Sequence, residues 1–165
     1  MKKILISACL LGENVRYDGK NSKVASEILE RWMQEKRLIP VCPEVLGGLP
    51  VPRSRSEIVK GTGQDVIDHL ALVKSEHGED FTDYFIKGAR KTLQIAIDHN
   101  VKYAIFKSKS PSCGSGKIYD GTFKGQLKEG DGVTVALLKK YGIQMFTEKN
   151  MEELEDILRL QEMEE

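Results

Sequence analysis

Short apolar runs alternate with amphipathic stretches along most of the chain. Residues 2–8, 38–41, 102–108 and 144–146 are short and mostly apolar, which predicts strands. Apolar residues recur at helical spacing within residues 22–36, 80–100 and 133–141, and a last helix is expected after Asn150. Strands that alternate with helices favour right-handed βαβ units. The pattern predicts an α/β fold: a three-layer, Rossmann-like parallel sheet with helices on both faces.

Two long segments interrupt this alternation. Residues 42–58 hold three of the five prolines together with Gly47 and Gly48, and residues 109–132 are rich in glycine and serine. Loops of this length in a compact domain are usually functional. Residues 57–72 are ambiguous, and a small hairpin around Gly61 and Gly63 is one interpretation.

Composition limits the class of protein. A chain of 165 residues with 40% apolar content can bury a full core, so we expect one domain over residues 1–165. The 25 basic and 25 acidic side chains cancel, which gives no net attraction to nucleic acid or anionic lipid. No apolar run approaches the roughly 20 residues of a membrane helix, and residues 4–8 are too short for the apolar part of an export signal. We expect a cytoplasmic protein that binds neither a membrane nor a nucleic-acid polymer.

The three cysteines share one position relative to the predicted strands. Cys9 follows the first strand, Cys42 follows the second, and Cys113 lies in the loop after the third. In open α/β sheets the ligand site lies outside the carboxyl ends of the strands. The fold therefore predicts that the three thiols converge at that edge of the sheet.

The chemistry of this convergence has several interpretations. Burial as small apolar side chains stays open, although the Ser, Gly and Pro residues around Cys113 offer little apolar packing. A disulfide framework is disfavoured by an odd cysteine count in a reducing compartment. A structural zinc site usually has four ligands, and none of His69, His77 and His99 lies in a cysteine loop. An iron-sulfur cluster held by three thiolates would leave one iron open to a substrate.

Five sequence blocks then point to a family. They are "SACLLG", "VRYDGK", "VCPEVLGGLPVPR", "KSPSCGSGKIYDGTF" and "GDGVTVALLKKYGI", and they span nearly the whole chain. In content and order they resemble the thiouracil desulfidase family, bacterial proteins formerly grouped as a domain of unknown function. The resemblance implies a 4Fe-4S cluster bound by Cys9, Cys42 and Cys113. It further implies non-redox removal of sulfur from a thiolated pyrimidine, either a 2-thiouracil-like base or a thio-nucleotide, with release of sulfide. The iron-sulfur assembly machinery would then be a partner.

The same resemblance points to Glu44 and Ser110 as residues that handle protons. A carboxylate near a ligand could deprotonate water, and a hydroxyl could relay a proton to the ring nitrogen. On the residues alone, Glu44 could equally accept backbone N–H groups of the Gly47–Gly48 turn, and Ser110 could form the turn before Pro111. Residues 16–19 ("RYDG") and 52–57 ("PRSRSE") are interpreted as solvated turns.

Two other functions remain alternatives to catalysis. A redox or iron-sensing protein could hold the same cluster, and a metal-free domain could bind a small molecule. An enzyme needs a concave site with room for a planar ring and with donors such as Ser110, Arg53 or Lys109 facing it. A sensor does not need such a site.

Overall fold

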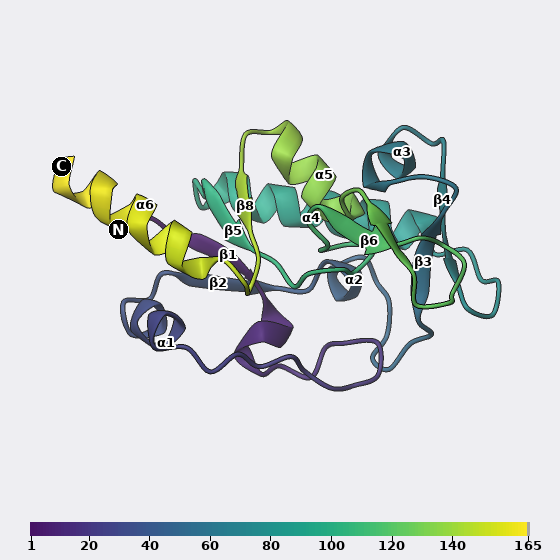
Figure 1. Ribbon diagram of the computed structural model, residues 1–165, viewed down its shortest axis with the longest axis horizontal. Helices are drawn as coiled ribbons and strands as arrows, with labels where there is room; N and C mark the ends of the chain where they lie inside the picture. Colours follow the sequence, from purple (N-terminus) through teal and green to yellow (C-terminus); the bar gives the residue numbers. More distant parts are fainter. Residues whose placement is uncertain (165) are drawn as a thin grey trace.

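A four-stranded parallel sheet forms the centre of the computed structural model, which describes residues 1–164 (Figure 1). Its strands are β1 (Ile4–Ser7), β2 (Leu38–Val41), β5 (Tyr103–Ile105) and β8 (Gln144–Phe146), in the order β2-β1-β5-β8. Ile4 pairs with Leu38 on one side and with Tyr103 on the other. All four strands were predicted from their apolar runs, and the parallel sheet is confirmed.

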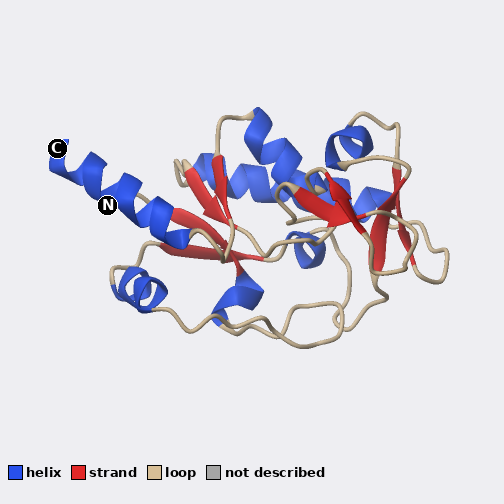
Figure 2. Cartoon of the chain, viewed as in Figure 1, coloured by secondary structure: helices blue, strands red, loops and turns tan. Residues whose placement is uncertain are grey.

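Helices cover both faces of this sheet (Figure 2). Successive strand residues point to opposite faces, so Ile4 and Ile6 share one face and Leu5 takes the other. The first face packs on α1 (Glu27–Gln34) and α6 (Met151–Glu164), with Trp32 and Leu154 in the contact. The second face packs on α4 (Thr82–Asp98) and α5 (Val133–Lys140), through residues that include Leu93, Ala96 and Leu138. The predicted three-layer α/β architecture is confirmed.

Local signals set the ends of the helices. The first helix begins at Glu27 rather than near residue 22, because Ser26 is its N-cap and accepts the Leu29 N–H at 3.3 Å. Asn100 has φ 53 just beyond α4, as expected of a left-handed cap. Among residues 1–164, no helix combines the length and the apolar character that crossing a bilayer requires.

The two long segments contain regular structure that the sequence did not predict. Residues 42–58 begin with the short helix α2 (Pro43–Leu46) and run into β3 (Ser56–Val59). Residues 109–132 hold the antiparallel pair β6 (Lys117–Tyr119) and β7 (Leu127–Glu129). The ambiguous segment does form a hairpin of β3 with β4 (Leu72–Ser75), but not as a tight turn at the glycines: α3 (Gly63–Ile67) lies between the strands.

A third core cluster joins these smaller elements. Ile58 of β3, Val73 of β4 and Ile118 of β6 pack with Phe85 of α4 and Val133 of α5. Figure 1 shows β3, β4 and β6 together at the end of the molecule away from the C-terminus. The hairpins are therefore attached to the main body through α4 and α5, next to the carboxyl edge of the central sheet.

Candidate functional site

A cavity of about 210 Å³ opens at the carboxyl edge of the central sheet. Strands β1 and β5 are neighbours in the sheet. The chain that leaves β1 does not continue to β5 but to β2, which pairs with the opposite edge of β1. Such a change of direction creates a crevice that binds ligands in open α/β sheets. Ser7 connects the ends of β1 and β5 at this crevice. Its Oγ accepts the backbone N–H of Lys107, just after β5, at 2.9 Å.

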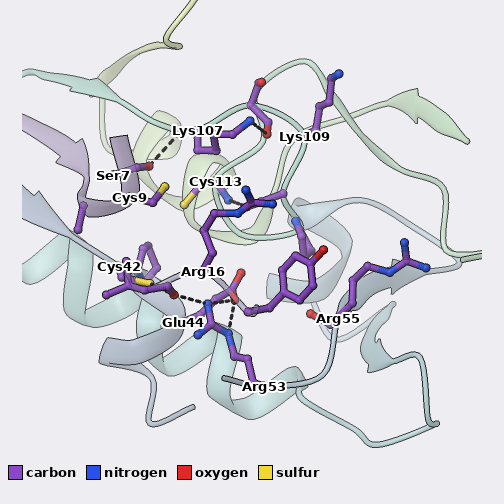
Figure 3. Close-up of a pocket in the computed structure, with 18 of the residues that line it drawn as sticks. Ser7, Cys9, Arg16, Cys42, Glu44, Arg53, Arg55, Lys107, Lys109 and Cys113 are labelled. Carbon is purple, nitrogen blue, oxygen red and sulfur yellow. Dashed lines mark hydrogen bonds and ion pairs between the residues drawn. The ribbon is translucent and has the colours of Figure 1, made fainter. Parts of the chain in front are cut away.

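The structure brings the three cysteines to this cavity. Cys9 lies in the 3-10 helix η1 (Ala8–Leu11) directly after β1, Cys42 lies between β2 and α2, and Cys113 lies in the loop after β5. All three line the cavity, and all three are free thiols. Figure 3 shows their side chains around the same space. Strand order alone therefore accounts for the meeting of residues that are far apart in sequence.

Tight loops hold the thiols in place. The 3-10 helix that carries Cys9 ends at Gly12, whose φ of 97 favours glycine, and the N–H groups of Gly12 and Ser22 both donate to the Cys9 carbonyl. At the other side, a Cβ on Gly132 would lie 2.5 Å from the Ser112 carbonyl oxygen. The loop that carries Cys113 therefore packs directly on the backbone at the start of α5.

Burial and mutual charge keep the thiols neutral. Burial raises the pKa of Cys9 to about 11, and the neighbouring Cys42 adds to this rise. Burial likewise raises the pKa values of Cys42 and Cys113, and the charges of Cys42, Glu44 and Cys9 raise the latter further. A cationic group bound among the thiols would reverse this preference, because it favours the thiolate forms.

The donor set of the cavity bears on the kind of metal group that it could hold. Among residues 1–164, no three His, Cys, Asp or Glu side chains lie close enough together to hold a single ion. The ligands of one zinc ion all lie about 2.0–2.3 Å from it. In a 4Fe-4S cluster each thiolate binds a different iron. Three free thiols at one cavity are the soft donor set that such a cluster takes.

Glu44 is held by an arginine rather than by the turn that follows it. Arg53 contacts Glu44 Oε2 through Nε at 2.8 Å and through Nη2 at 2.7 Å. The N–H groups of Gly47 and Gly48 donate instead to backbone carbonyls, so the turn-binding interpretation of Glu44 is wrong. Glu44 lines the cavity next to Cys42 and its Oε1 takes no part in the ion pair.

Ser110 has the turn-forming role that its position before Pro111 suggests. Its Oγ accepts the backbone N–H of Cys113 at 2.7 Å and that of Ser112 at 3.2 Å. Ser110 also lines the cavity. Because the hydroxyl is the acceptor in both bonds, its own O–H can still donate, and the two roles are compatible.

Five cations line the cavity, and this corrects one expectation from the sequence. They are Arg16, Arg53, Arg55, Lys107 and Lys109. Residues 52–57 do not form a solvated turn, because the Arg53 side chain is only 4% exposed. Residues 16–19 are partly solvated, yet Arg16 reaches toward the thiols (Figure 3). Asp18 stays outside the cavity lining and shapes that turn by accepting the Lys20 N–H.

The comparisons identify the family of this chain. The family model described as 2-thiouracil desulfurase matches residues 4–150. The chain belongs to the 2-thiouracil desulfurase family. It is 46% identical to a Bacillus subtilis (strain 168) relative named Uncharacterized protein YbbK, over 94% of this chain and 99% of the relative. It also resembles the solved structure of a 4Fe-4S-dependent thiouracil desulfidase, TudS, with a TM-score of 0.88, 41% identity and coverage of 97% of this chain and 99% of that one.

Sequence reasoning missed Glu148, a carboxylate that supports the site of this 2-thiouracil desulfurase family member from outside the cavity lining. Glu148, just after β8, accepts the Ser108 backbone N–H at 3.1 Å and lies 3.6 Å from Lys107 Nζ. Burial opposes ionisation of Glu148, but the hydrogen bonds from Ser108 and the charge of Lys107 outweigh it and lower its pKa. The sequence signal for this residue was a carboxylate shortly after the predicted strand at residues 144–146. Glu148 fixes the loop after β5, which carries Ser110.

Proposed function

We propose that this protein binds a 4Fe-4S cluster through Cys9, Cys42 and Cys113 and removes sulfur from a thiolated pyrimidine. One observation carries the proposal: three thiols from three separate loops line a single cavity. Membership of the 2-thiouracil desulfurase family and the likeness to a 4Fe-4S-dependent thiouracil desulfidase support it. When bound, the cluster would supply a Lewis-acidic iron with an open position for the substrate's sulfur.

The reaction needs no net electron transfer. Water replaces the sulfur of a C=S group, which gives the C=O product and hydrogen sulfide, so every atom keeps its formal oxidation level. Cleavage is then of the hydrolase type. The protein must activate the water and supply a proton to the ring, and these are tasks for side chains of the cavity.

Glu44 and Ser110 are suited to these two tasks. Arg53 holds Glu44 through Oε2, and Oε1 can accept a proton from water. Two backbone N–H groups donate hydrogen bonds to Ser110 Oγ and fix its position, and its O–H can donate to a ring nitrogen. Tyr17 and Tyr119 also line the cavity, and their aromatic side chains are of a type that packs on a planar ring.

The charge of the cavity bears on the choice between a free base and a nucleotide. Five cations and one carboxylate, Glu44, line it. A phosphate or another anionic substituent on the thiopyrimidine would therefore be attracted. We expect a thio-nucleotide to bind more tightly than the free base, with both containing the same C=S group.

The chemistry of the site also suggests its setting in the cell. Free cysteines that must remain thiols are compatible with a reducing compartment such as the cytoplasm. A cluster held by three thiolates would be supplied there by the iron-sulfur assembly machinery.

The test is desulfuration by protein reconstituted without oxygen. Holoprotein should convert 2-thiouracil or its nucleotide to the oxo product, release one sulfide per turnover and need no reductant. In isotopically labelled water the label should appear on the product carbonyl. Glu44→Gln should keep iron and sulfide but lower turnover about 10²–10⁴-fold, the range for loss of a general base, and Ser110→Ala should lower it less.

A matched control is Glu152→Gln, which changes an exposed carboxylate on α6 and should leave turnover unchanged. Full activity of Glu44→Gln would remove Glu44 from the mechanism. Intact holoprotein that releases no sulfide from any thiopyrimidine would favour the sensor alternative instead.

A further inference from the structure

Glu57 of β3 is a buried carboxylate that the proposed reaction does not use. The residue is 1% exposed and does not line the cavity. Its Oε1 accepts the backbone N–H of Gly121 at 2.9 Å and that of Phe123 at 3.1 Å. Its Oε2 is buried and has no hydrogen-bond partner within residues 1–164. Burying a carboxylate costs free energy, so a buried glutamate such as Glu57 is expected to have a specific role.

The two N–H groups belong to the turn that connects β6 to β7, residues 120–126, here called the β6–β7 turn. This turn is pressed against β3: Gly121 has φ 91, and a Cβ there would lie 2.6 Å from the Ile58 carbonyl oxygen. Glu57 is therefore the acceptor that holds the backbone of the β6–β7 turn on the strand.

Arg55 holds the same turn from a neighbouring position. Its Nη2 donates to the Phe123 carbonyl at 3.4 Å, and its guanidinium carbon lies 5.6 Å from the centroid of the Phe123 ring. Arg55 directly precedes β3, two residues before Glu57, and so reaches the turn from the beginning of the strand. One binds the carbonyl of Phe123 and the other binds its N–H.

This assembly reaches the cavity through two residues. Arg55 lines the cavity itself, and Tyr119, the last residue of β6 before the turn, lines it as well. Figure 3 shows Arg55 on the side of the cavity away from Cys9 and Cys113. Arg55 thus stands away from these thiols, and Tyr119 leads into the turn that Arg55 holds; we call these two lining residues the distal wall.

We propose that Glu57 is a positioning residue for substrate binding, which fixes the distal wall by holding the β6–β7 turn on β3. The proposal rests on the function proposed above. The distal wall faces the part of the substrate that is remote from the sulfur, namely the ring edge or its substituent. Contacts to a part that does not react are equally strong in the ground state and the transition state, so their loss raises KM and leaves kcat unchanged.

Kinetics of reconstituted holoprotein test this role. Glu57→Ala removes the acceptor of both N–H groups and should raise KM about tenfold or more, with kcat within about twofold of wild type, as for lost uniform binding. Glu57→Gln keeps one oxygen for both N–H groups and should restore KM. Iron and sulfide content should be equal in all three proteins, because none of the changes touches a thiol.

Hydrogen exchange supplies a readout that needs no substrate. Segment 117–129 should exchange faster in Glu57→Ala holoprotein than in wild type, and Glu57→Gln should restore its protection. Asp65→Ala is the matched control, because Asp65 also uses a carboxylate to accept a backbone N–H, that of Thr62 at 2.8 Å, at a position that does not line the cavity. It should leave KM unchanged.

Gly121→Ala reaches the same turn without changing Glu57. Its Cβ would collide with the Ile58 carbonyl and should lift the turn, so KM should rise as in Glu57→Ala. If Glu57→Ala does not fold, Gly121→Ala tests whether displacement of the β6–β7 turn raises KM.

Three results would overturn the role of Glu57. The first is faster exchange of segment 117–129 in Glu57→Ala with an unchanged KM, and the second is a rise of KM in Asp65→Ala equal to that in Glu57→Ala. The third is a fall of kcat in Glu57→Ala with an unchanged KM. Wild-type holoprotein without any desulfuration would remove the proposed function instead, and the exchange data would still report on the turn.

Discussion

Arg53 is the residue that connects the loops of the site. Its backbone N–H donates to the Tyr17 carbonyl, and its guanidinium donates to the carbonyls of Val15 and Pro50 as well as to Glu44. A planar guanidinium can make several such bonds at once, and an ammonium group cannot reproduce the geometry. Arg53 therefore joins the segment after β1 to the segment after β2 and orients the carboxylate that lies beside Cys42.

The first prediction concerns the energy of this connection. Arg53→Gln leaves Glu44 and two carbonyls without their donors, and we expect the free energy of unfolding to fall by about 2–4 kcal/mol, as for a broken buried ion pair. Urea unfolding of the cluster-free protein measures this change. Arg31→Gln, which breaks a pair with Glu155 in which the arginine side chain is 43% exposed, should cost less than about 1 kcal/mol. Equal losses in the two variants would show that Arg53 does not have this role.

Burial of Arg53 could not be predicted from the sequence, although convergence of the cysteines could. The cysteines follow strands whose apolar runs are visible, and strand order then places them at one edge. Arg53 instead stands in a stretch of Pro, Ser and Arg residues that is typical of a solvated loop. It is buried because residues 15–17 fold over it. The pattern of apolar and polar residues along the chain does not indicate that contact.

At the scale of elements, the crossing of α2 and α4 positions Cys42 and Glu44. The two helices approach until their backbones touch: a Cβ on Gly47 would lie 1.9 Å from the Tyr84 carbonyl oxygen, and one on Gly88 would lie 1.9 Å from the Pro43 carbonyl oxygen. Both positions therefore require glycine for close approach. Because α2 begins directly after Cys42, this contact sets where the thiol and the carboxylate stand.

The second prediction reverses the usual effect of alanine in a helix. Gly→Ala within an exposed helix normally stabilises by roughly 1 kcal/mol. Gly88→Ala should instead destabilise by about 1–3 kcal/mol, the usual cost of overpacking, because α2 must move away. Thermal unfolding measures the change, and Lys87→Ala on the exposed side of the same helix is the control. A more stable Gly88→Ala protein would contradict the close contact.

Length and apolar content decide which elements the sequence could predict. The helix α4 shows several turns of apolar periodicity, and the four strands of the central sheet stand out as apolar runs. The helix α3 has only five residues, too few to show a helical period, and β6 (KIY) and β7 (LKE) contain charged residues and so do not form apolar runs. They are held by tertiary contacts such as the burial of Ile118 in the third core cluster, and such contacts are not visible in the local sequence.

For the whole molecule, the thiols lie at the rim of cores that are complete without a metal. Cys9 belongs to the core cluster on one face of the sheet and Cys113 to the cluster on the other face, each among many aliphatic and aromatic side chains. The layers are thus joined by apolar packing. We therefore expect the fold to persist without a bound cluster, unlike a zinc finger, in which metal binding provides the folding energy.

The last prediction follows from this independence. Cys9→Ser, Cys42→Ser and Cys113→Ser should each lose the visible absorption of anaerobically reconstituted protein, because a site with three thiolates has no spare ligand. Each should still give the far-ultraviolet circular dichroism of wild type and one cooperative unfolding transition, since a buried hydroxyl costs about 1–3 kcal/mol against a total stability of about 5–15 kcal/mol. Ser115→Ala, two residues beyond Cys113, controls for disturbance of the loop and should keep its absorption. A Cys113→Ser protein with full iron and sulfide would exclude the loop after β5 as a source of ligands, and loss of the fold in any of the three would show that the metal site and the core are coupled.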